Sequence, residues 1–134
     1  MAGETDLDKL IREMRPELNA GEYVFCSMDP KDRLANLEPL GWFREREGVT
    51  LILPKAQADE LALPYSFVSA WITLTVHSAL EAVGLTAAVS QALAQAKISC
   101  NIVAAYYHDH LFVPIGDADR AIETLQSMAR PKQG

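Results

Sequence analysis

The charged residues of this chain are distributed very unevenly, and this distribution restricts the fold more than any other feature. The stretch 61–108 holds 48 residues but only two charged side chains, Glu81 and Lys97, whereas residues 1–60 hold 21 charged side chains. Charged side chains are almost never fully buried unless they are paired, so a stretch that lacks them can lie inside a protein. We therefore expect the middle of the chain to be buried on most of its faces.

The length and the cysteines indicate a small intracellular domain. A chain of 134 residues and 14.7 kDa can bury enough surface for one compact domain or two very small fused ones, without a disulfide or a metal to hold it. Cys26 and Cys100 lie far apart in apolar, strand-like runs, which is typical of reduced core cysteines in a cytoplasmic protein. We expect no cofactor.

The charge argues against several classes of partner. The net charge is −6 and the pI is about 5.0, whereas nucleic-acid binding needs a cluster of Lys and Arg. The acidic N-terminus lacks the apolar segment of a signal peptide. Residues 61–80 contain no charge, but polar residues interrupt them in a two-residue rhythm that suits a soluble strand better than a membrane helix. We expect a soluble, cytoplasmic protein with no nucleic-acid or membrane partner.

The first half of the chain predicts a short helix, a strand, a hairpin and a second short helix. Apolar residues at helical spacing precede Pro16, and alternating apolar runs separated by turn residues follow it. The predicted elements are a docking helix at 6–14, a strand at 22–28, a turn at 29–32, strands at 42–47 and 49–53 joined through Gly48, and a helical segment at 55–61.

The second half repeats this order more plainly. It predicts a strand at 70–77, a helix from the region of Thr86 to Lys97, a strand at 98–107, a hairpin tip at Asp109, a strand at 110–115 and a final helix capped by Asp117. The order is strand, helix, strand, strand, helix, and no sequence remains for a fourth strand. We expect the first half to supply that strand, with residues 22–28 as the donor.

Strand, helix, hairpin and helix are most of a ferredoxin-like unit, and right-handed crossovers fix how that unit is arranged. The loop after the first strand and the hairpin of the second and third strands then lie at the same end. The first and third strands are neighbours, so His77 and His110 should come close to each other, with His108 beside them. Any functional site should be sought at this end.

Several segments resemble the small bacterial tandem ACT-domain proteins: Trp71-Ile-Thr-Leu-Thr-Val-His-Ser, Glu81-Ala-Val-Gly-Leu-Thr, Ile98-Ser-Cys-Asn, Tyr106-Tyr-His-Asp-His-Leu-Phe-Val-Pro114 and Leu18-Asn-Ala-Gly-Glu-Tyr-Val-Phe-Cys26. ACT domains are ferredoxin-like modules that pair side by side and often bind amino acids at the interface of the pair, as in aspartate kinases and the cytosolic arginine sensor of animals. The resemblance implies an α+β fold in which two ferredoxin-like ACT units form a continuous antiparallel sheet with helices on one face. The expected units are residues 1–67, which include the docking helix, and residues 68–134.

The resemblance places an amino-acid ligand at the first loop of the second half, and elementary chemistry supports that placement. The ligand's carboxylate suits the unpaired N–H groups of a helix start near Gly84, Leu85 and Thr86. Its ammonium group needs an acid, for which Glu81 and Asp109 are the candidates. Further expected contacts are His77, Ser78, Asn101 and His110, with Ser27 and Asp29 of the equivalent loop in the first half as a second half-site.

The leading hypothesis is therefore a regulatory or sensor module that binds an amino acid, is not an enzyme, and acts through an unidentified regulated protein. A homodimer is expected through a sheet face carrying Trp71, Thr73 and Thr75. One alternative is an association module without a ligand, in which Glu81 and Asp109 are solvated loop acids and Gly84 is only a backbone joint. Another alternative is a metal site built from His77, His108 and His110. Hydrolysis is not favoured, because no nucleophile motif such as G-x-S-x-G occurs.

Overall fold

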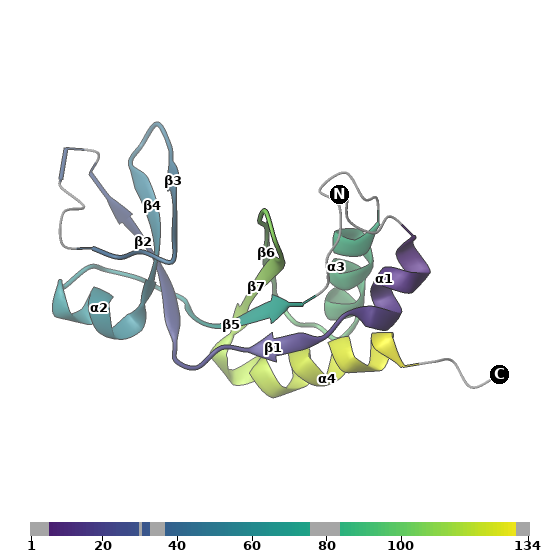
Figure 1. Cartoon of the computed structure of the whole chain (residues 1–134). Helices are drawn as coiled ribbons and strands as arrows, with labels where there is room; N and C mark the ends of the chain where they lie inside the picture. Colours follow the sequence, from purple (N-terminus) through teal and green to yellow (C-terminus); the bar gives the residue numbers. More distant parts are fainter. Residues whose placement is uncertain (1–5, 30, 33–36, 76–83, 131–134) are drawn as a thin grey trace. The chain divides into compact units, whose positions relative to one another are not determined.

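The computed structural model of the chain describes residues 6–29, 31–32, 37–75 and 84–130 (Figure 1). The elements are, in order, α1 (Leu7–Glu13), β1 (Pro16–Leu18), β2 (Tyr23–Met28), β3 (Gly41–Arg44), β4 (Val49–Pro54), α2 (Lys55–Glu60), β5 (Val68–Leu74), α3 (Leu85–Gln95), β6 (Asn101–Ala104), β7 (Asp109–Pro114), a 3-10 turn (Ile115–Asp117) and α4 (Ala118–Ala129). The strand order is β3-β4-β2-β5-β7-β6, and β1 also pairs with β5. This is the expected α+β fold with two ferredoxin-like units. Within the described ranges, no helix is both long and apolar enough to cross a membrane.

The chain forms two compact units, which we describe separately. The central unit is Ala20–Ser69, and the terminal unit joins the segment up to Asn19 with the segment from Ala70 onward. The leading segment therefore belongs to the same compact unit as the C-terminal half of the chain.

The fourth strand of the terminal unit is β1, which lies beside β5 in Figure 1. The pairing is antiparallel, with Pro16 opposite Leu74 and Leu18 opposite Ile72. The prediction that residues 22–28 donate this strand was wrong for the terminal unit, because β2 pairs with β5 only at Val68 and Ser69, which belong to the central unit. Proline and charged residues are typical of edge strands, so the Pro-Glu-Leu sequence of β1 suits its position although it does not resemble an apolar strand.

The core of the terminal unit lies between its strands and three helices. The helices α1, α3 and α4 contact one another. Their buried side chains, together with those of β5 and β7, include Leu10, Met14, Ile72, Leu74, Val89, Leu93, Leu111, Val113, Ala121 and Leu125. Two of these belong to the leading segment, and full burial of each such side chain stabilises the fold by about 1.5–3 kcal/mol. The predicted docking helix is therefore an integral part of this core.

The central unit has a smaller core and fewer helical residues. Its buried apolar cluster consists of Val24, Cys26, Leu51, Leu53 and Ala58. The β3–β4 hairpin closes through a hydrogen bond from the Glu45 N–H to the Gly48 carbonyl, 3.0 Å long. A Cβ atom at Gly48 would lie 2.9 Å from the Met28 carbonyl oxygen, which explains why glycine occupies this turn.

Two predictions about exposed positions in the terminal unit were wrong. The tip of the β6–β7 hairpin is Ala105–His108, closed by a 3.0 Å bond from the Ala105 N–H to the His108 carbonyl, so Asp109 is the first residue of β7 and not the tip. The sheet face carrying Trp71 and Thr73 is not an open apolar patch, because Thr73 is 8% exposed and Trp71 is half-buried. His77, the last residue of the predicted strand, lies outside the described residues.

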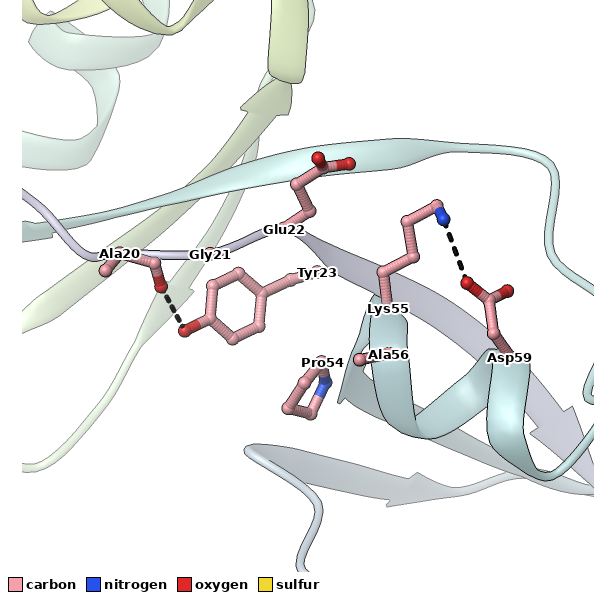
Figure 2. A pocket seen from close by; sticks show the side chains of 8 residues that line it. All are labelled: Ala20, Gly21, Glu22, Tyr23, Pro54, Lys55, Ala56 and Asp59. Atoms are coloured by element: carbon pink, nitrogen blue, oxygen red, sulfur yellow. Dashed lines mark hydrogen bonds and ion pairs between the residues drawn. The ribbon is translucent and has the colours of Figure 1, made fainter.

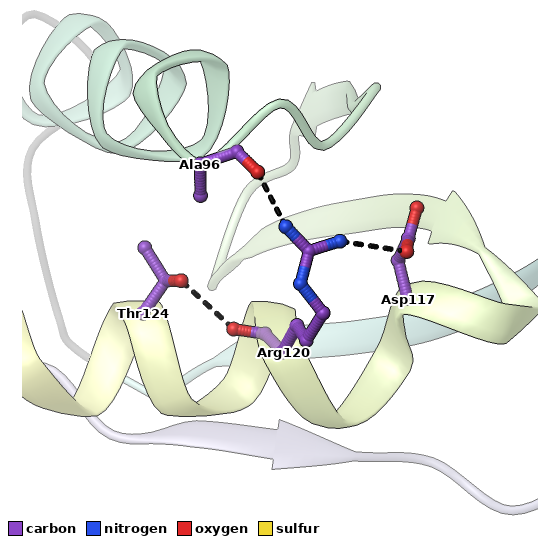
Figure 3. Close-up of polar contacts among 4 residues, drawn as sticks. All are labelled: Ala96, Asp117, Arg120 and Thr124. Atoms are coloured by element: carbon purple, nitrogen blue, oxygen red, sulfur yellow. Dashed lines mark hydrogen bonds and ion pairs between the residues drawn. The ribbon is translucent and has the colours of Figure 1, made fainter.

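Arg120 links the start of α4 to the end of α3 (Figure 3). Its guanidinium donates to the Asp117 carboxylate at 2.9 Å and to the Ala96 carbonyl at 2.5 Å. Asp117 was expected to cap α4, and it does occupy the N-cap position, but its side chain binds Arg120 and makes no capping hydrogen bond. The last carbonyl groups of a helix lack intrahelical partners, so this arginine satisfies one of them for α3.

Gly84 gives a direct test of how α1 packs. Its φ of +103° disfavours any residue with a side chain, and an added Cβ would lie 3.1 Å from the Cδ2 atom of Leu7. We predict that Gly84→Ala lowers the free energy of unfolding by about 1–2 kcal/mol from the backbone alone. Chemical denaturation measures this loss. Adding Leu7→Ala to the Gly84→Ala chain should recover only the part of the lost free energy of unfolding that the clash with Leu7 causes. Gly116→Ala is the matched control, since nothing lies within 4 Å of its added Cβ; equal losses at both glycines would contradict the prediction.

Candidate functional site

The start of α3 has the geometry that an anionic group requires. Gly84 occupies the N-cap position in a left-handed conformation, and its carbonyl accepts the first helical hydrogen bond from the Ala88 N–H at 2.8 Å. Leu85 is buried and Thr86 is exposed. Among the described residues, no acceptor binds the N–H groups of Leu85 and Thr86. Leu7 of α1 covers one side of Gly84. The space that this glycine leaves by having no side chain is therefore used for packing against α1.

Asp109 is a buried residue at the start of β7. It is 8% exposed, and strand alternation places it on the same face as Leu111 and Val113, which are core residues. No hydrogen bond or ion pair holds its carboxylate within the part of the chain that the structure describes. Burial raises the pKa of Asp109 above its ordinary value of 3.8, while the neighbouring His110 and His108 act in the opposite direction. A charged group in this environment is costly unless something binds it.

His110 lies at the centre of a polar network on the other face of the sheet. Its Nδ1 accepts a hydrogen bond from the Trp71 Nε1–H at 3.0 Å and lies 3.1 Å from the Thr73 hydroxyl. An indole N–H can only donate, so Nδ1 is unprotonated and the neutral ring carries its hydrogen on Nε2. The Asn19 side-chain amide donates to the Thr73 hydroxyl at 3.0 Å and to the Trp71 carbonyl at 3.2 Å. The network therefore joins the end of β1 to β5 and β7.

The electrostatics keep the His110 ring neutral. Burial lowers the pKa of His110 below its ordinary value of 6.5, and His108 lowers it further, whereas Asp109 raises it. The two histidine rings are edge-on, with centroids 6.5 Å apart. The Nδ1 atom of His108 is buried and has no hydrogen-bond partner among the described residues.

The predicted metal site is not favoured by this arrangement. The Nδ1 atom of His110 is already occupied by hydrogen bonds. In the ranges that the structure describes, no group of three or more His, Cys, Asp or Glu side chains is placed to hold a metal. His77, the third proposed ligand, lies outside those ranges.

Within the terminal unit, Asn101 is not brought together with Asp109. Asn101 is exposed and pairs with Phe112, three residue pairs from the Ala104–Asp109 pair that ends the hairpin, or about 10 Å along the strand. Ser27 and Asp29 belong to the central unit, where Ser27 is exposed on β2 and the Asp29 carboxylate accepts a bond from the Lys31 N–H at 2.9 Å. Ser78 and Glu81 lie outside the described residues.

Neither cysteine is suited to nucleophilic chemistry. Burial raises the pKa of Cys100 to about 11 and also raises the pKa of Cys26 above its ordinary value of 9.0. The reactive form of cysteine is the thiolate, so both thiols are unreactive at neutral pH.

The sequence prediction missed a pocket of about 480 Å³ in the central unit (Figure 2). It lies where β2 begins and where β4 passes into α2, and it is lined by Gly21, Glu22, Tyr23, Pro54, Lys55 and Asp59 among others. The spacing of Lys55 and Asp59, four residues apart on a predicted helical segment, was the available signal. A second cavity, of about 280 Å³, is lined by Arg15 and Arg130 in the terminal unit.

Comparison with known families gives a consistent result for both halves of the chain. Two family profiles, each describing the ACT domain, match residues 2–70 and residues 66–127. Among curated proteins, none matches the chain.

Comparison with solved structures extends this result. A protein of unknown function from Vibrio cholerae, VC0802, named as a possible transport protein, is 46% identical, with a TM-score of 0.85 over 92% of this chain and 96% of that one. The ligand-free regulatory subunit of aspartate kinase from Thermus thermophilus is 11% identical, with a TM-score of 0.61 over 86% of this chain and 97% of that one. Aspartokinase III of E. coli, in complex with aspartate and ADP, is 16% identical, with a TM-score of 0.61 over 89% of this chain and 33% of that one. The last two likenesses concern the fold alone.

The His110 network predicts a pH dependence of stability. Because the pKa of His110 is lowered in the folded chain, the unfolded chain binds more protons below pH 6.5, so stability should fall as the pH drops through and below that value. Denaturant titrations between pH 7.5 and 5.5 measure this slope. His110→Gln should reduce it, whereas His108→Gln should leave most of it in place. A slope of the opposite sign, or a slope that His110→Gln leaves unchanged, would show that the network does not keep the His110 ring neutral in the folded chain.

Proposed function

Because this chain belongs to the ACT-domain family, we propose that it is a regulatory module that binds a free amino acid and has no catalytic activity of its own. The likeness to a regulatory subunit of aspartate kinase, and to an aspartokinase solved with aspartate, supports the ligand class. We assign one ACT repeat to residues 1–67 and the other to residues 68–134. The output passes to a regulated protein that remains to be identified. The two unpaired cysteines support a cytoplasmic location.

The observation that carries this proposal is the Asp109 carboxylate, whose pKa burial raises and which no hydrogen bond or ion pair holds among the described residues. The Asp109 residue is 8% exposed, and a partly desolvated carboxylate without a hydrogen bond destabilises the chain that contains it. Groups held in this way cluster at functional sites, where a ligand supplies the missing interaction. The ammonium group of an amino acid is a cation of suitable size with three N–H donors. Asp109 is therefore our first candidate for the acid that binds it, and Glu81 is the second.

The start of α3 supplies the complementary half of the site. The N–H groups of Leu85 and Thr86 and the positive end of an 11-residue helix favour a carboxylate. His110 lies on the opposite face of the sheet from Asp109, and its ring is neutral, so it places no positive charge behind the ligand's ammonium group. In this proposal, the residues of the terminal unit that hold the ligand are Gly84, Leu85, Thr86 and Asp109, together with His77, Ser78 and Glu81, while His110 supports Asp109 from the other face of the sheet.

An association module without a ligand is the second candidate function, and exposed aromatic residues on two edge strands favour it. Trp42 and Phe43, which are 54% and 72% exposed, lie on β3, at one end of the strand order. Tyr106 and Tyr107, which are 76% and 69% exposed, lie in the turn that follows β6, at the other end of the strand order. Exposed apolar groups and unpaired strand edges promote association of chains.

We predict that an amino acid at 100 times its Kd raises the stability of the chain by about 2.7 kcal/mol. A thermal-shift screen of the twenty amino acids identifies the ligand, and calorimetry then gives its affinity. Asp109→Asn should weaken binding by about 1–3 kcal/mol, the effect of losing a charge-assisted hydrogen bond. The same change should raise the melting temperature of the free protein, because it removes a buried charge.

Glu123→Gln is the matched control for this substitution, since it removes one negative charge from an exposed position on α4. It should change neither the affinity nor the melting temperature by a comparable amount. Glu81→Gln tests the second acid in the same way. Absence of heat and of stabilisation with all twenty amino acids would contradict the proposed ligand class and leave the association module.

We also propose a homodimer. Light scattering at micromolar concentration should give about 29 kDa, twice the chain mass of 14.7 kDa. Phe43→Lys should shift the population toward the monomer, because it places a charge on the exposed edge of β3. Ser127→Lys is the control, because it places the same charge at an exposed position on α4. A single species of 14.7 kDa for the unaltered protein would contradict the dimer.

A further inference from the structure

The pocket of the central unit combines an ammonium group, two carboxylates and an apolar wall (Figure 2). Its volume of about 480 Å³ lies within the range of sites for small organic ligands. It lies at the end of the sheet where β2 begins and β4 ends, and none of its lining residues belongs to the site proposed at α3. What it can bind follows from the hydrogen-bonding capacity that its side chains leave unused.

Lys55 retains donors that face a ligand. Its Nζ binds the Asp59 Oδ2 atom at 2.9 Å, which uses one of the three N–H bonds of the ammonium group. The Lys55 side chain is 37% exposed, so the remaining N–H bonds are accessible from the pocket. The hydrogen bond to Asp59 raises the pKa of Lys55, and the same bond lowers the pKa of Asp59, so both groups are charged at neutral pH. Tyr65 fixes the other Asp59 oxygen through a 2.5 Å bond from its hydroxyl.

Glu22 supplies the opposite charge. Its main-chain carbonyl accepts a 2.8 Å bond from the Lys55 N–H, which brings the first residues of β2 and α2 together. Glu22 lines the pocket, and no hydrogen bond or ion pair holds its carboxylate among the described residues. The pocket therefore offers unused cationic donors on Lys55 and unused anionic acceptors on Glu22, which are the two requirements of a zwitterion.

Another part of the pocket lining is apolar and fixed. Figure 2 shows the Tyr23 ring and Pro54 on the same side of the pocket. The Tyr23 hydroxyl donates to the Ala20 carbonyl at 2.8 Å, across the turn that Gly21 makes with a φ of +99°. A ring held in this way provides a preformed contact for an uncharged side chain.

We propose that this pocket binds an α-amino acid with an uncharged, apolar side chain, as a second site separate from the one at α3. The ligand's carboxylate takes the unused donors of Lys55, its ammonium group pairs with Glu22, and its side chain lies on Tyr23 and Pro54. The ligand class is the one given under the proposed function, but the residues and the unit are different. A carboxylic acid without an amine has no ammonium group to pair with Glu22, and its negative charge lies near both Glu22 and Asp59. An amine without a carboxylate leaves the Lys55 donors unused.

The test is a titration of the full chain followed by the backbone amide resonances of each site. The probes are L-leucine, 4-methylpentanoate, which lacks the amine, and 3-methylbutylamine, which lacks the carboxylate, followed by the remaining amino acids. L-leucine should shift the amides of Gly21 to Tyr23 and of Lys55 to Asp59, and each analogue should bind at least about tenfold more weakly. Lys55→Gln and Glu22→Gln should each reduce the affinity by about tenfold or more, without unfolding the chain.

The controls separate this pocket from the site at α3. Lys97→Gln removes an exposed charge outside the pocket and should leave the titration unchanged. If an amino acid shifts Leu85, Thr86 and Asp109 but not the amides of the pocket, the second site is overturned and the proposed function stands. If it shifts only the amides of the pocket and Asp109→Asn has no effect, the second site stands and the site at α3 is overturned. Binding at the pocket that survives both Lys55→Gln and Glu22→Gln would also overturn the assignment.

Discussion

The pairing of β5 determines how both units are completed. Neither half of the chain contains four strands in the order that a ferredoxin-like unit requires, so each half depends on a strand from outside its own sequence. The central unit uses the start of β5, where Val68 and Ser69 pair with Val24 and Tyr23. The terminal unit uses β1, which pairs with the later residues of the same strand. One seven-residue strand therefore takes part in both units.

The β1–β5 pairing also shapes the site at α3. Asn19 fixes the end of β1 through its main-chain N–H, which donates to the Trp71 carbonyl at 2.9 Å, and through its side-chain amide. With β1 held in this position, α1 reaches the core and places Leu7 over Gly84. The leading segment thus covers one side of the helix start that we propose as the carboxylate site. A change in the position of that segment would alter the proposed site, although the segment itself does not touch the ligand. The leading segment is therefore a simple structural link between the proposed site and the regulated protein that we propose.

Sequence periodicity was sufficient to predict most of the elements, and the resemblance of several segments to tandem ACT-domain proteins indicated the family. The alternating run of β5 and the helical spacing of α3 and α4 gave the right element types, because each is long and has one apolar face. The strand β1 could not be found in this way, since it has three residues, one proline and one charge. Its identity depends on pairing with β5, which is distant in the sequence, so tertiary structure and not local preference makes it a strand.

The candidate sites were less accessible to prediction, for two physical reasons. Asp109 was expected at a hairpin tip because aspartate is common in turns, but the turn is formed by Ala105–His108 and the strand alternation of β7 buries the carboxylate. The pocket of the central unit depends on Glu22 and Lys55 coming together from separate elements, which no local pattern records. In contrast, the start of α3 was predicted closely, because the helical spacing of apolar residues that begins at Leu85 is a local signal.

The measurement that tests the central claim most directly is a crystal structure of the chain grown with the amino acid that stabilises it most. The account predicts the ligand's carboxylate on the N–H groups of Leu85 and Thr86, and its ammonium group within hydrogen-bonding distance of Asp109 or Glu81. A ligand bound elsewhere, with Asp109 still buried and without a partner, would contradict the proposed regulatory site.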